Sequence, residues 1–242
     1  MSESNPVVPR AKSSSSFVYL AGGLGLLAAV LLVVAAALET PGSSLASFLT
    51  WAFATNSVQT MWYITRAAGL VAYLVLWLSV AWGLAVSSKI LDTVLHRSFT
   101  YDFHYFLSWL AIGFTILHIG VLMFDKYLPY SLLQILLPFI SPYRPLWVGI
   151  GVLGLYLMVL VTVTFYLRGR IGMKAFRWIH TSSLVAYLGI TVHSIFSGTD
   201  SSLTSVVLMY VSTFLITVFL LGYWVFTAVQ RSRRKALAHR IA

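Results

Sequence analysis

Long uncharged stretches, each of the length needed to cross a lipid bilayer, recur along this chain. A transmembrane helix needs about 20 consecutive apolar residues. Stretches of that size cover residues 17–38, 67–88, 103–124, 145–167, 178–199 and 201–230. The pattern predicts an all-α integral membrane protein: a six-transmembrane-helix bundle over residues 17–230, with a polar N-terminal tail at residues 1–16 and a basic tail at residues 231–242.

Two shorter apolar segments fall below spanning length. Residues 131–137 are followed by Pro138, which cannot continue a helix, so we expect a short helix lying at the membrane interface or dipping into it. Residues 43–53 have the same character. The apolar run at 17–38 is too long for a typical signal peptide, so we predict that it is an uncleaved first membrane helix.

The composition strengthens this interpretation. Of the 242 residues, 59% are hydrophobic and 9% are charged, whereas a soluble domain is about 25% charged. These values exclude a soluble globular protein, a disordered chain and a nucleic-acid-binding domain, although the net charge is +10. The chain has no cysteine, which excludes disulfides, thiolate metal sites and thioether-linked haem.

Basic residues gather on one side of the predicted bundle and set its orientation. The opposite side carries only Lys126 and Arg144, apart from Arg66 at the start of a helix. The basic residues of the first side are Arg10, Lys12, Lys89, Arg97, Arg168, Arg170, Lys174, Arg177, Arg231, Arg233, Arg234, Lys235 and Arg240. By the positive-inside rule both termini are cytoplasmic, and we expect a multi-pass protein of the cell membrane, such as the bacterial inner membrane.

Four of the six histidines lie inside predicted spans, where polar groups are costly to keep. His104 and His118 are 14 residues apart in the third span, and His180 and His193 are 13 apart in the fifth. The two spans run in the same direction, so each histidine has a partner at its own depth, and the two levels are about 20 Å apart. Two b-type haems, each bound by one imidazole from each helix, would fit this arrangement.

The alternative is that these histidines are interhelical hydrogen-bonding groups. A spacing of 13 residues falls about 140° short of whole turns, so His180 and His193 cannot both face the third span from an ideal helix. Gly189 lies between them and could permit a local distortion. His96 and His239 have no partner at their depth, and we expect neither to bind a metal.

Several motifs resemble a known family, the ferric reductase-like transmembrane domain. They are WYITRAAGLVAYL at residues 62–74, the histidine spacings of 14 and 13, PFISPYRP at 138–145 and HSIFSGTD at 193–200. The similarity covers about residues 60–200. This membrane domain is shared with NADPH oxidases, eukaryotic ferric reductases and the haem subunit of the periplasmic methionine sulfoxide reductase system.

The resemblance implies six helices, two stacked haem b groups and electron transfer across the membrane. It implies the axial pairs His104 with His180 and His118 with His193. NADPH oxidases continue into a flavin and nicotinamide domain, whereas this chain has no Gly-rich dinucleotide motif and stops at Ala242. We therefore expect electrons from a separate flavoprotein, carrying FMN or FAD, or from quinol, and delivery to an external acceptor.

Other polar and aromatic residues have less specific roles. Arg66, level with His118 and His193, could bind a propionate of the outer haem or could extend to the lipid headgroups. Asp200 alone would be a weak cation site. The remaining candidates are Arg97, Lys174 and Arg177 for the inner propionates, Tyr187 and Phe114 between the levels, and Trp62, Trp147 and Tyr143 in the interfacial belt.

The sequence therefore predicts a bis-haem transmembrane electron-transfer protein, the membrane component of an oxidoreductase whose acceptor is a ferric complex or a partner protein. A quinol-linked cytochrome b is a related alternative. The opposing interpretation is a membrane transporter or structural protein whose histidines hold no cofactor.

Overall fold

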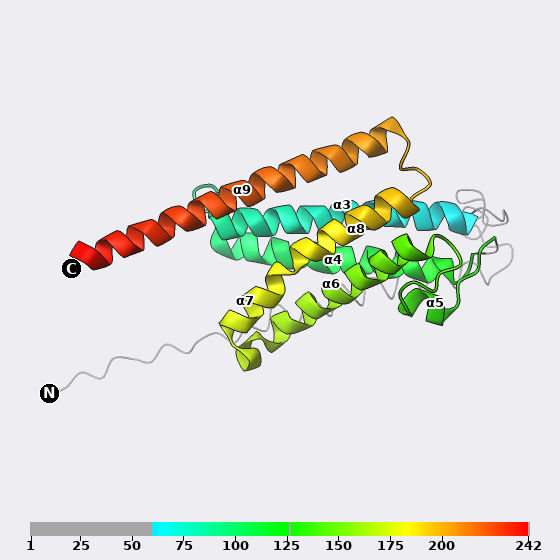
Figure 1. Cartoon of the computed structure of the whole chain (residues 1–242), viewed down its shortest axis with the longest axis horizontal. Helices are drawn as coiled ribbons and strands as arrows, with labels where there is room; N and C mark the ends of the chain where they lie inside the picture. The colour runs from blue at the N-terminus through cyan, green and yellow to red at the C-terminus, as the bar shows by residue number, and fades with distance from the viewer. Residues whose placement is uncertain (1–59, 126, 242) are drawn as a thin grey trace, which may run out of the picture. The chain divides into compact units, whose positions relative to one another are not determined.

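The computed structural model describes residues 60–125 and 127–241 and contains, within them, helices and no strand. The helices, drawn in Figure 1, are α3 (Thr60–Ser88), α4 (Arg97–Leu122), α5 (Leu132–Leu136), α6 (Pro145–Ile171), α7 (Met173–Thr181), α8 (Ser183–Ser197) and α9 (Thr204–Ile241). The all-α prediction is confirmed for this part of the chain.

The described residues include five segments long and apolar enough to cross a membrane. They are α3, α4, α6, the combined α7 and α8, and most of α9. The chain is therefore a multi-pass membrane protein. The predicted first span at 17–38 and the segment at 43–53 lie outside the described residues.

The predicted centres of these five spans are right, but several ends are misplaced. α3 begins at Thr60, so Arg66 lies inside the helix instead of before it. α9 continues to Ile241, and the predicted basic tail is therefore helical from its start. A charged residue interrupts an apolar stretch of sequence. Arginine is a good helix former, however, so the helix continues through it.

The short helix α5 forms where the sequence places it. The Ser131 hydroxyl accepts a hydrogen bond from the backbone N–H of Gln134 at 3.3 Å, and the Gln134 side chain accepts one from the N–H of Ser131 at 2.9 Å. This reciprocal capping box satisfies two amide groups that the first turn leaves free. The helix ends at Leu136, before Pro138.

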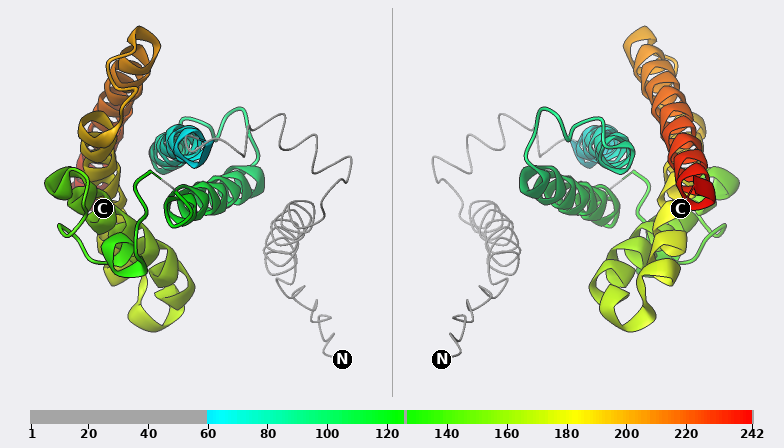
Figure 2. Two further views of the ribbon diagram at one scale, coloured as in Figure 1. Left: turned by 90° about the vertical axis from the view of Figure 1, so that its right-hand side faces the viewer. Right: turned by 90° about the vertical axis from the view of Figure 1, so that its left-hand side faces the viewer.

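The helix α3 is central in the packing. It contacts α4, α8 and α9, while α6 packs against α7 and α8 (Figures 1 and 2). At the core, the rings of Tyr73 and Tyr187 stack with their centroids 6.1 Å apart, and Tyr210 meets Tyr73 edge-on at 5.1 Å. These contacts join α3, α8 and α9 around one buried aromatic cluster.

Polar contacts fix α9 against α3 within this core. The Tyr73 hydroxyl lies 2.6 Å from Thr213 Oγ1, and the Trp77 indole N–H donates to the Thr213 carbonyl at 3.0 Å and to Thr217 Oγ1 at 3.2 Å. Further along, the Arg231 guanidinium donates to the carbonyls of Ser87 and Ser88. A cation at these terminal carbonyls caps the end of α3.

The predicted fifth span is interrupted, and the interruption lies at Ser182 instead of at Gly189. The Ser182 N–H and Oγ both donate to the carbonyl of Ile179, at 3.0 and 2.6 Å. Thr181 Oγ1 likewise donates back to Arg177. Hydroxyl groups that bond preceding carbonyls bend helices, whereas α8 continues unbroken through Gly189.

Replacing Thr213 tests the link between α3 and α9. We expect Thr213→Val to lower the free energy of unfolding by about 1 kcal/mol, because it removes the closest partner of the buried Tyr73 hydroxyl. Thermal unfolding in detergent would measure the loss. Thr227→Val is the control, since the Thr227 hydroxyl bonds the Trp224 carbonyl of its own helix. Equal losses of unfolding free energy in the two variants would show that the Tyr73–Thr213 contact does not stabilise the packing of α9 on α3.

Candidate functional site

The structure brings the four intramembrane histidines together in two pairs. The rings of His104 on α4 and His180 on α7 have their centroids 6.0 Å apart. The rings of His118 on α4 and His193 on α8 are 6.4 Å apart. The interruption at Ser182 separates the two histidines of the fifth span, which explains how both reach α4 despite a spacing that an unbroken helix would turn away.

The His118 ring lies against the backbone of α3 at Gly69, which has no side chain. Its Nδ1 is 2.8 Å from the carbonyl oxygen of Thr65. A Cβ atom added to Gly69 would lie only 2.9 Å from the same nitrogen. The missing side chain at Gly69 is therefore what lets the ring approach the helix and reach the carbonyl group.

The same arrangement occurs at His193, which lies against α6. Its Nδ1 is 3.0 Å from the carbonyl oxygen of Trp147. A Cβ atom on Gly151 would lie 2.6 Å from that nitrogen. Here α6 supplies the carbonyl and the glycine that α3 supplies to His118.

His104 has a third version of this contact. A Cβ atom on Gly83 would lie 3.1 Å from His104 Cε1, and Ser79 Oγ is 3.4 Å from His104 Nδ1. In all three cases the oxygen belongs to the residue four positions before the glycine, one turn away on the same helix face. We call each such oxygen–glycine set an imidazole cradle.

His180 differs from the other three histidines. Its Nδ1 is buried and has no hydrogen-bond partner among the described residues. Its ring lies 5.2 Å, between centroids, from that of Phe176 on the same short helix. His180 as a whole is half-buried, and no residue of α7 is fully buried.

The hydrogen bonds at Nδ1 determine the chemistry of the opposite nitrogen. A carbonyl oxygen can only accept, so Nδ1 of His118 and of His193 carries the proton. The lone pair of each neutral ring is then at Nε2, the nitrogen free to bind a metal. A carbonyl partner also fixes the ring orientation and increases the basicity of the ligand.

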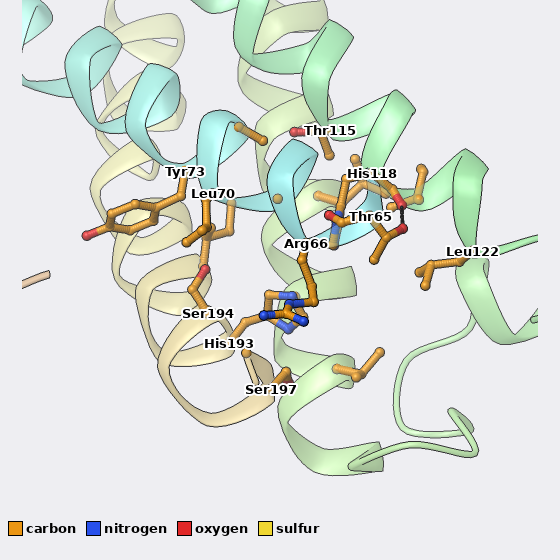
Figure 3. Close-up of a pocket in the computed structure, with 18 of the residues that line it drawn as sticks. Thr65, Arg66, Leu70, Tyr73, Thr115, His118, Leu122, His193, Ser194 and Ser197 are labelled. Carbon is orange, nitrogen blue, oxygen red and sulfur yellow. Dashed lines mark hydrogen bonds between the residues drawn. The ribbon is translucent and has the colours of Figure 1, made fainter. Parts of the chain in front are cut away.

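A cavity of ≈ 190 Å³ adjoins the His118–His193 pair, bordered by α3, α4, α6 and α8 (Figure 3). Its wall is mostly apolar, with Arg66 and Asp200 among its few charged residues. Tyr130, from the loop before α5, also lines it and hydrogen-bonds Ser141 Oγ at 3.0 Å. Burial raises the pKa of the Tyr130 phenol, which therefore stays protonated at neutral pH.

Arg66 forms an ion pair that the sequence did not suggest. Its Nε donates to Asp200 Oδ2 at 2.7 Å and its Nη2 to Oδ1. The pair is two-pronged and partly shielded, with 28% of the Arg66 and 19% of the Asp200 side chain exposed. Asp200 therefore has a guanidinium partner, and the propionate role of Arg66 stays a prediction.

The remaining candidates are dispersed. Arg97 pairs with Asp92 in the loop before α4, and Lys174 and Arg177 are exposed. Tyr187 is fully buried, whereas Phe114 is half-buried. His96 is exposed, and the side chain of His239 lies outside the part of the chain that the structure describes.

The interfacial aromatic residues make specific contacts around the cavity. Trp62 meets Tyr143 edge-on at 6.2 Å, and Trp147 stacks on Phe196 at 4.2 Å. The Tyr143 hydroxyl donates to the Ser197 carbonyl at 3.2 Å. They link the start of α6 to α3 and to the end of α8.

The glycines were missed by the sequence analysis, although a signal was present. Gly69 and Gly83 are 14 residues apart, the same spacing as His104 and His118. On two adjacent antiparallel helices, equal spacings place a glycine at the depth of each histidine.

The Arg66–Asp200 pair should contribute measurably to stability. In a double-mutant cycle with Arg66→Ala and Asp200→Ala, we expect a coupling free energy of about 1–2 kcal/mol, because the contact is bidentate and shielded. Chemical unfolding in detergent micelles would measure it. The Arg97–Asp92 pair, with 61% of the arginine exposed, is the control and should give less than about 0.5 kcal/mol. Similar coupling in both cycles would show that shielding is unimportant.

No protein-family model matches the chain, and no curated protein or solved structure is similar enough to count as a match.

Proposed function

We propose that this membrane protein binds two b-type haems, one at each histidine pair, and passes electrons across the membrane as ferric reductase-like proteins do. The donor is a cytoplasmic flavoprotein or quinol, and the acceptor is a ferric complex or a protein on the other side. When bound, haem supplies one-electron transfer by cycling between ferric and ferrous iron.

The distance between paired rings carries this proposal. Two imidazoles that bind one iron from opposite sides, each through a metal–nitrogen bond of about 2 Å, have ring centres about 6 Å apart. The two pairs have centroid distances of 6.0 and 6.4 Å. Edge-to-face packing also gives centroid distances of about 4.5–7 Å, so the distance supports the proposal together with the Nδ1 bonds of His118 and His193, which leave each Nε2 free to bind iron.

The number of protein ligands also suits haem. Among residues 60–125 and 127–241, no cluster of three or more His, Cys, Asp or Glu side chains could hold a metal ion. Each histidine pair supplies two ligands, and a porphyrin supplies the other four nitrogens of a six-coordinate iron. Two imidazoles are therefore enough for haem but too few for a structural zinc site.

The chain's own residues would orient these ligands and keep water from them. The carbonyls of Thr65 and Trp147 hold His118 and His193 with Nε2 unprotonated, the state that binds iron. The mostly apolar lining around this pair limits access of water. Arg66 lines the same cavity as His118 and His193, and its guanidinium would hold a haem carboxylate there with Asp200 as its second partner.

The opposing function is that of a transporter or structural protein without haem. The ring pairs would then be packing contacts, and the purified protein would be colourless. A reduced-minus-oxidised absorption spectrum of the full chain separates the two classes. A quinol-linked cytochrome b would differ in being reduced by a quinol analogue without added flavoprotein.

Haem stoichiometry gives the main test. We expect about two haem b per chain by pyridine haemochrome assay. The double variant His118→Ala/His193→Ala and the double variant His104→Ala/His180→Ala should each lose one haem. His96→Ala is the control and should lose none. A chain that contains no haem when produced in haem-sufficient cells would refute the proposed function.

Charge at the Arg66–Asp200 pair should shift one reduction potential. Arg66→Leu removes a positive charge that favours the reduced form, so the potential of the haem at His118–His193 should fall by roughly tens of millivolts. Asp200→Asn should raise it. Spectroelectrochemical titration would measure both, with the other haem as an internal control. Unchanged potentials at full haem content would leave the pair a purely structural contact.

A further inference from the structure

The four histidines are not held equally, and the difference lies at His180. His118 and His193 each bond a helix carbonyl through Nδ1, and His104 has the Ser79 hydroxyl nearby. For His180 the corresponding nitrogen is buried without a partner among the described residues. Any function that depends on ring orientation is thus least constrained at this position.

His180 also has no glycine against its ring. Cβ atoms added to Gly69, Gly83 and Gly151 would meet the rings of His118, His104 and His193. Among the glycines of the described residues, none has His180 among the atoms that an added Cβ would meet most closely. His180 therefore has no cradle of the kind that holds the other three rings.

The position of His180 in the chain adds to its freedom. It lies in the nine-residue helix α7, one residue before Thr181, and α7 is separated from α8 by Ser182. α7 packs against α6 and α8. His104, by contrast, lies within the 26-residue helix α4.

We infer that His180 is the exchangeable ligand of the pair, and that a small neutral ligand such as carbon monoxide can take its place. This rests on the proposed function, since it requires haem at the His104–His180 level. In the exchange the bond from Nε2 of His180 to ferrous iron breaks and an iron–carbon bond forms, with no electron transferred. Loss of an outer-shell partner of a metal ligand typically weakens binding about 10- to 100-fold, which favours exchange at this ligand alone.

Carbon monoxide binding to the dithionite-reduced full chain tests the inference. We expect about one carbon monoxide per two haems, because within residues 60–125 and 127–241 His180 is the one paired histidine whose Nδ1 is buried without a partner. The double variant His118→Ala/His193→Ala should keep one haem that binds carbon monoxide. The double variant His104→Ala/His180→Ala should keep one haem that does not.

Two glycine variants test the cause without removing a ligand. Gly151→Ala places a Cβ atom against the His193 ring and should break its bond to the Trp147 carbonyl, so the haem at the His118–His193 level should then bind carbon monoxide as well. Gly113→Ala is the control, because open space surrounds Gly113, and it should leave carbon monoxide binding unchanged.

The outcomes separate this inference from the function on which it rests. A chain without haem refutes both. A chain with two haems that binds no carbon monoxide, or binds it at the His118–His193 level instead, overturns only the exchange of His180. Equal carbon monoxide binding in Gly151→Ala and Gly113→Ala would overturn the missing Nδ1 partner as its cause.

Discussion

The hydrogen bond from an imidazole Nδ1 to a helix carbonyl is the interaction on which the arrangement of the site depends. An imidazole N–H left unpaired in hydrocarbon is costly, and a helix offers a carbonyl to a side chain only where no other side chain blocks the approach. Gly69 and Gly151 create these openings on two different helices. Because each opening faces a histidine, helix packing and ring orientation are determined by the same contact.

The central position of α3 follows from this requirement. It must meet α4 closely enough to contact His118 through Gly69 and His104 through Gly83, while its other side carries Tyr73 and Trp77 towards α9. Small residues on one face and large aromatic residues on the other allow both. Close backbone approach at small residues is the usual basis of helix association in membranes, where apolar surface gives no preference for protein over lipid.

The sequence was enough to predict the helical class and the centres of five spans, because apolar length is a strong constraint. It could not locate the ends, since Arg66 stops an apolar run without stopping a helix. From the sequence we expect any break at Gly189, because glycine is a poorer helix former than serine. The helix breaks at Ser182 instead, where the hydroxyl bonds a preceding backbone carbonyl. Arg66 and Asp200 are 134 residues apart in the sequence, so no local sequence pattern could predict that they form an ion pair.

Two arginines hold α9 in register along α3. Near one end of α3, Arg66 binds Asp200 in the segment that leads into α9, and at the other end Arg231 of α9 binds the carbonyls of Ser87 and Ser88. Between them, Thr213 receives the side chains of Tyr73 and Trp77. A piston-like movement of α9 by one turn, about 5.4 Å, would break all three attachments at once. A partner that binds the basic end of α9 would therefore pull on α3, the helix that carries two of the three cradles.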